Sequence, residues 1–152
     1  MKKLILLIVL CATGLISQTS FAQGRMRENI ALQPTWGPVG YDRVEYYYLP
    51  EIETYYNVPM HQFTYQKDGH WVTTPTLPHR YKDFNLYKTR KVVINDYRPY
   101  MHHKEYLRRY KSNDRHSIEQ NIHDSHDSRY FVIKDHPEHS KWKGERRDHD
   151  RH

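Results

Sequence analysis

Three pairs of histidines near the end of the chain share one spacing, and no other side chains in the sequence are better suited to metal chemistry. The pairs are His123 and His126, His136 and His139, and His149 and His152. Imidazoles three positions apart can meet one ion on a helical turn, and nearby carboxylates can add ligands. Imidazole suits Zn, Cu and Ni, so ligand type does not select the metal. The alternative, which we favour, is a solvated histidine-rich tail whose spacings follow from its composition.

Tyrosines form the second group of interest, since they make up 14 of the 152 residues. Alternation places Tyr47 and Tyr55 with Glu45 and Glu53, on the more polar side of the predicted strands. Exposed there, Tyr47 and Tyr55 would offer a surface for sugar rings. The alternative, which we favour, is that the tyrosines supply apolar area to a thin core while their hydroxyls reach water.

Enzyme signatures are missing from the sequence, which has no G-x-S-x-G, no H-E-x-x-H and no glycine loop for phosphate. No carboxylate lies three or four positions from His103, and Glu105 is the only one at such a helical spacing from His102. We therefore predict a non-enzymatic protein, in which His103 belongs to a helix stripe that packs on a sheet.

The first residues have the pattern of an export signal. Lys2 and Lys3 precede an apolar run over 4–16, and Ser20 and Ala22 suit signal peptidase. This predicts a Sec signal peptide over 1–22 and a product that is not transmembrane after cleavage, since a membrane span needs about 20 apolar residues. A retained anchor is the alternative. Leu10 before Cys11 does not fit a lipidation motif, and this single cysteine leaves with the leader.

The rest of the chain divides by composition into three parts. We predict a flexible lead-in over 23–34, a small β-rich domain over 35–111, and a charged, mostly disordered tail over 112–152. Within the tail, Tyr130–Ile133 is β-prone, and it predicts either an edge strand on the sheet or on a partner, or an apolar segment in a floppy tail.

The predicted domain is mainly β (α+β): a small antiparallel β-meander of four to five strands with one C-terminal helix. Period-2 alternation and β-branched residues predict strands near 44–48, 52–58, 61–66, 70–74 and 91–94, and Pro99 opens the helix. At Asp68-Gly69 we favour a three-residue loop, because it sets Tyr65 opposite Trp71 and pairs two aromatic rings.

A set of ordered motifs runs through this domain: EYYYLPE at 45–51, YYNVP at 55–59, FTY at 63–65, GHW at 69–71, LP at 77–78 and KVVINDY at 91–97. The set resembles uncharacterised small secreted proteins of Bacteroidota-type bacteria. The resemblance implies an envelope or periplasmic setting and brings no catalytic residues with it.

The formal net charge of +6 favours anionic partners. Export argues against nucleic acid. We therefore predict an exported, periplasmic or extracellular protein with a structural or interaction role. Its partner would be an anionic envelope component (polysaccharide, peptidoglycan or lipid headgroups) or an envelope protein. The alternative is extracytoplasmic binding of divalent metal through the histidine-rich tail.

Overall fold

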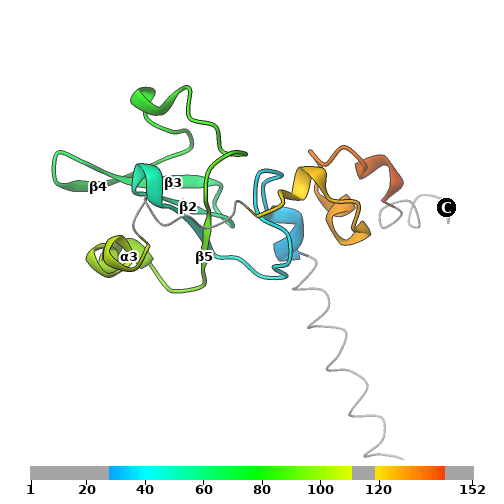
Figure 1. The fold of residues 1–152 in the computed structure, drawn as a ribbon, viewed down its shortest axis with the longest axis horizontal. Helices are drawn as coiled ribbons and strands as arrows, with labels where there is room; N and C mark the ends of the chain where they lie inside the picture. The colour runs from blue at the N-terminus through cyan, green and yellow to red at the C-terminus, as the bar shows by residue number, and fades with distance from the viewer. Residues whose placement is uncertain (1–27, 111–118, 143–152) are drawn as a thin grey trace, which may run out of the picture.

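The computed structural model describes residues 28–110 and 119–142, and a five-stranded antiparallel sheet lies at its centre (Figure 1). The strands are β1 (Tyr46–Leu49), β2 (Thr54–Asn57), β3 (Gln62–Lys67), β4 (His70–Thr74) and β5 (Val92–Ile94). Their order is β4-β3-β2-β1-β5, so β4 and β5 are the edge strands. A 3-10 turn, η3 (Pro99–His102), leads into the helix α3 (His103–Arg109). The predicted fold class, a small meander with a fifth strand and a helix after it, is confirmed.

The turn between β3 and β4 differs from the prediction. Gln66 lies opposite Trp71 and Lys67 opposite His70, so the loop has two residues and not three. Asp68 and Gly69 both have positive φ, 52° and 77°, which is the pattern of a type I′ turn. This turn matches the twist of the strands, and that local geometry outweighs the pairing of two rings. Trp71 consequently lies over the other face of the sheet from Tyr65.

The two faces of the sheet are covered by different parts of the chain (Figure 1). One face carries Tyr47, Tyr56 and Phe63, and it packs against side chains from the N-terminal segment and from the loop after β4. The opposite face packs against η3 and α3. The two layers bury β1 and most of β2, whereas the end of β3 and much of β4 are exposed or half-buried.

Tyr47 and Tyr55 lie in these two cores and not on the surface. Both side chains are 0% exposed, Tyr47 on the first face and Tyr55, stacked on Tyr48, on the second. The turn η1 (Pro50–Ile52) lies between β1 and β2, and Tyr47 pairs with Tyr56 while Tyr48 pairs with Tyr55. The exposed surface for sugar rings at Tyr47 and Tyr55 is therefore wrong. The favoured alternative is right that both tyrosines belong to the core, but their hydroxyls contact Gln33 and His103 and do not reach water.

Parts of the predicted flexible lead-in and of the predicted disordered tail are folded in the structure. Residues 28–32, placed in a flexible lead-in, form a helix, and Ile30 in it is buried. Residues 119–142, placed in a disordered tail, contain the 3-10 turns η4 (Ile122–Asp124), η5 (Ser128–Val132) and η6 (His139–Lys141). Ile30, Ile122, Tyr130 and Ile133 form a third buried cluster. The leader 1–22, with 23–27, 111–118 and 143–152, lies outside the described residues.

Tyr130–Ile133 is not a strand. Its residues lie in and just after η5, whose first turn is capped by the Asp127 carboxylate, which accepts from the Arg129 N–H at 2.9 Å. The Tyr130 hydroxyl accepts from the Gly40 N–H at 2.7 Å. The segment thus packs on the N-terminal part of the chain and does not extend the sheet.

Candidate functional site

A cleft of about 470 Å³ opens beside the edge strand β5. Arg90 and Lys91 line it at the start of the strand, Tyr41 and Tyr110 supply aromatic walls, and Glu119 contributes a carboxylate. This volume falls within the range of small-molecule sites in proteins, which is about 300–1,000 Å³. The cleft therefore has room for one sugar or for a small anionic group.

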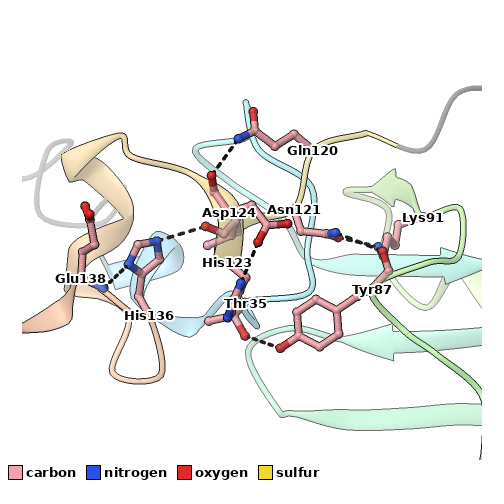
Figure 2. A network of polar contacts seen from close by, with 10 residues as sticks. Thr35, Tyr87, Lys91, Gln120, Asn121, His123, Asp124, His136 and Glu138 are labelled. Carbon is pink, nitrogen blue, oxygen red and sulfur yellow. Dashed lines mark hydrogen bonds and ion pairs between the residues drawn. The ribbon is translucent and has the colours of Figure 1, made fainter.

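Lys91 is half-buried in this cleft and is held by an amide, not by a carboxylate. Its Nζ donates to Asn121 Oδ1 at 2.8 Å, and Asn121 Nδ2 donates to the Tyr87 carbonyl at 3.0 Å (Figure 2). In the part of the chain that the structure describes, no carboxylate forms an ion pair with Lys91. An ammonium group has three N–H donors, so the contact with Asn121 leaves two for a ligand or water.

Burial lowers the pKa of Lys91 to about 8, and the negative charges of Glu119 and Glu51 oppose this shift. The shift has this direction because burial penalises the charged form of a lysine. At neutral pH the side chain is still mostly charged. A half-buried cation with little compensation is stabilised by any anion that enters the cleft.

The walls of the cleft combine a second cation with aromatic rings. The Arg90 guanidinium lies 5.7 Å from the centroid of the Tyr110 ring. The Tyr41 hydroxyl donates to Glu119 Oε1 at 3.5 Å, and burial, with Glu119 as a second cause, raises the pKa of Tyr41. The cleft thus brings two cations together with the Glu119 carboxylate, which is already in contact with a tyrosine, and Glu51 adds a second negative charge near Lys91.

Segments far apart in the sequence hold Lys91 in place (Figure 2). The backbone N–H of Ile122 donates to the Gly37 carbonyl at 2.8 Å, and that of His123 donates to the Thr35 carbonyl at 2.8 Å. The hydroxyls of Thr35 and Tyr87 are 2.9 Å apart and share a hydrogen bond. Residues 119–124 are therefore fixed between the N-terminal segment and the chain entering β5.

Of the predicted metal ligands, His136 is buried and uses both ring nitrogens. Its Nδ1 accepts from the Glu138 N–H at 3.0 Å, so the proton is on Nε2, which donates to the Ile122 carbonyl at 3.0 Å (Figure 2). The Nδ1 of His139 donates to the Phe131 carbonyl at 2.7 Å. The structure does not support the predicted pairing of His136 with His139 on one ion, because the Nε2 of His136 is bound to η4 and its Nδ1 to the Glu138 N–H.

The other predicted ligands lie elsewhere. His123 Nδ1 is 2.8 Å from Asp124 Oδ1, and His126 Nδ1 is 3.3 Å from Glu138 Oε1. Within residues 28–110 and 119–142, no three His, Cys, Asp or Glu side chains gather in a way that could hold a metal ion. His149 and His152 lie outside the described residues.

His103 packs on the sheet, as its place in the predicted stripe requires, but it also has a carboxylate partner that the sequence did not indicate. Its Nδ1 is 3.0 Å from the Tyr55 hydroxyl, and its Nε2 is 3.5 Å from Glu53 Oε2. Glu53 reaches it from a left-handed corner before β2, with φ 48°. Tyr55 is fully buried, and burial raises the pKa of its hydroxyl. These contacts tie α3 to the sheet.

The residues that define the cleft were not singled out by the sequence. Lys91 sits at the start of a predicted buried strand, and Asn121, 30 positions later, fell in the predicted tail. Neither has a local motif. Asn121 lies among polar and charged residues, so its sequence context does not indicate that it binds Lys91. Its position becomes clear only when the packing of its neighbour Ile122 is known.

Comparisons with protein-family models, curated proteins and solved structures give no match. The resemblance to secreted Bacteroidota-type proteins therefore stays a prediction. Among the described residues, no helix has both the length and the apolar character needed to cross a membrane.

Proposed function

We propose that this chain is an exported, non-enzymatic interaction protein that binds an anionic component of the cell envelope in the cleft beside β5. The observation that carries the proposal is the half-buried Lys91, next to Arg90, in a cleft of ligand size and with no ion pair to a described carboxylate. The export signal inferred from the first 22 residues gives the setting.

The cleft fits a sugar that bears a carboxylate or a phosphate. The anionic group would contact the Lys91 ammonium and the Arg90 guanidinium through charge-assisted hydrogen bonds, which are stronger than neutral ones. The rings of Tyr41 and Tyr110 would contact the sugar. Peptidoglycan supplies carboxylates and lipopolysaccharide supplies phosphates, so both carry sugars with an anionic group that fits the cleft.

Metal binding by the histidine-rich end remains the alternative from the sequence. No contact among the described residues favours it, because His136 is used to fix η4 and the remaining described histidines do not form a three-ligand cluster. We therefore place the anion-binding function first.

Retention on purified peptidoglycan and on immobilised lipopolysaccharide tests the proposal and distinguishes the two sources. The chain beginning at Gln23 is expected to bind one of them at low salt and to be released as salt screens the charges. Lys91→Gln is expected to weaken binding about tenfold, since one charge-assisted hydrogen bond contributes about 1.5–3 kcal/mol. Lys67→Gln, the same change at an exposed site on β3, is the matched control.

Thermal melts of both variants show whether they keep the fold. Equal retention of Lys91→Gln and wild type would contradict the assignment of the cleft. Failure of wild type to bind either material at low salt would contradict the function itself.

Retention is also expected to depend on pH with an unusual midpoint. The pKa of Lys91 is lowered to about 8, so its charge, and with it the attraction for an anion, is lost as pH rises above about 8. A bound anion raises the pKa of Lys91 above its value in the free protein. The affinity for the anion therefore falls between about pH 8, the pKa of the free protein, and the higher pKa of the complex. An ordinary lysine would keep its charge to about pH 10.

Lys91→Arg is the control for this pH profile, because a guanidinium stays protonated over the whole range. Arg90, Glu51, Glu119, Tyr41 and Tyr110 surround position 91 in both proteins, so the difference between the two profiles reports the lysine alone. Identical profiles for wild type and Lys91→Arg would contradict a role for the Lys91 charge.

A further inference from the structure

A second surface, outside the cleft, exposes apolar and basic side chains together. Five large hydrophobic side chains are exposed among the described residues, and three of them lie within ten positions along the chain. These are Tyr97, Met101 and Leu107, which are 83%, 67% and 38% exposed. Together with the basic residues Arg98, Lys104, Arg108 and Arg109, they make up what we call the α3 surface.

The geometry of η3 and α3 explains why these side chains point away from the protein. Pro99 and Tyr106 are buried against the sheet, and Tyr100 and His103 contact Trp71. These contacts use the inner side of the two turns. Residues 101, 104 and 108 recur at helical spacing on the other side, and all three are exposed. Leu107, four positions after His103, lies at the border between the two sides and is 38% exposed.

The α3 surface is strongly basic. Arg98, Lys104, Arg108 and Arg109 are all exposed, and in the described part of the chain none of them forms an ion pair with a carboxylate. Glu105 is the one exposed acid on the helix. The nearby carboxylate of Asp96 accepts a hydrogen bond from the Tyr106 hydroxyl. Arg98 has a left-handed backbone, φ 47°, and its guanidinium lies 5.2 Å from the Tyr97 ring centroid.

We propose that the α3 surface docks on a membrane surface rich in anionic lipid. Tyr97, Met101 and Leu107 would enter the headgroup region, where aromatic and apolar tips are stabilised, and the four cations would contact lipid phosphates. Charge complementarity selects this partner over a second copy, because a symmetric dimer through the surface would bring its four cations against the same four. α3 has seven residues, so it lies on the membrane and does not cross it.

This docking is independent of the cleft. It uses Tyr97, Arg98 and side chains of η3 and α3, whereas the cleft uses Arg90, Lys91 and the segment at 119–121. A protein with both would contact a glycan and a lipid surface at the same time. The two activities can therefore be removed separately.

Co-sedimentation with vesicles tests the proposal, using the chain beginning at Gln23 so that the apolar leader takes no part. Binding to vesicles that contain phosphatidylglycerol is expected, with little binding to phosphatidylcholine alone. The double variants Met101→Ser/Leu107→Ser and Lys104→Glu/Arg108→Glu are each expected to weaken binding about tenfold or more. The controls are Met60→Ser, at a site that is 62% exposed before β3, and Lys67→Glu.

The proposal would be overturned if the wild type did not bind anionic vesicles, or if both double variants bound as well as the wild type. It would also be overturned if Met60→Ser weakened vesicle binding as much as the double variants do. A dimer in gel filtration that the α3 variants dissociate would contradict it as well, because the surface would then bind a second copy of the chain. Thermal melts confirm that the variants keep the fold. Lys91→Gln is expected to bind vesicles like wild type, so a failure of the cleft and a failure of the α3 surface are distinguishable.

Discussion

Ile122→Ala is expected to lower the free energy of unfolding by about 2–5 kcal/mol, the usual cost of removing a large aliphatic side chain from a core. Ile122 is 0% exposed and packs with Ile30, Tyr130 and Ile133. Few apolar residues pack the 119–142 segment against the N-terminal segment, so each contributes a large share of the free energy of that packing. Urea unfolding followed by tryptophan fluorescence gives the free energy directly.

The effect is expected to extend to binding, because Asn121, which holds the Lys91 ammonium, is the preceding residue. Loss of retention on the envelope glycan should accompany the loss of stability. Leu107→Ala removes the same number of side-chain carbons at a half-exposed site and should cost much less. A stability of Ile122→Ala equal to that of wild type would mean that residues 119–142 do not pack on the N-terminal segment.

Tyr47 is expected to be the most costly position in the sheet. Its ring is fully buried and lies 5.4 Å from the Trp36 ring, and its hydroxyl donates to Gln33 Oε1 at 3.0 Å. Gln33 Nε2 in turn donates to the Tyr41 carbonyl at 3.0 Å. A Cβ added at Gly37 would lie only 2.6 Å from the Tyr47 hydroxyl, so no space surrounds that end of the ring.

Two substitutions separate the ring of Tyr47 from its hydroxyl. Tyr47→Ala leaves a large cavity and is expected to cost about 3–5 kcal/mol. Tyr47→Phe leaves the buried Gln33 oxygen without its donor and is expected to cost about 1–3 kcal/mol. Tyr97→Phe, at an exposed site, is the matched control and should be close to neutral. Denaturant unfolding measures all three, and a neutral Tyr47→Phe would contradict the buried hydrogen bond.

The sheet was predictable because its signal is local and repeated. Alternation around Tyr46 and Tyr48 and the β-branched run at Val92–Ile94 each indicate a strand without knowledge of the rest of the chain. The proline between β1 and β2 marks where the first strand ends. The register of β3 with β4 was mispredicted because we weighed ring pairing above the preference of Asp-Gly for a two-residue turn.

The third core and the cleft could not be predicted in this way. Ile30, Ile122 and the apolar run at 130–133 lie far apart in the sequence, and nothing local to any of them indicates that they pack together. Since Asn121 is placed by that core, the contact with Lys91 depends on it as well. The role of His136 could not be predicted either. Its spacing from His139 indicated a metal ligand, but it is buried and its Nε2 donates to the Ile122 carbonyl, so it is a structural residue.

The most direct test of the anion-binding cleft is an amide chemical-shift map of the protein beginning at Gln23, titrated with soluble peptidoglycan fragments and, separately, with inorganic phosphate. The proposed function predicts that the amides that shift cluster at Tyr41, at 90–95, at Tyr110 and at 119–121, and that Lys91→Gln needs about ten times more ligand to reach the same shifts. Shifts confined to α3 or to the β3–β4 hairpin, or none with either probe, would contradict it.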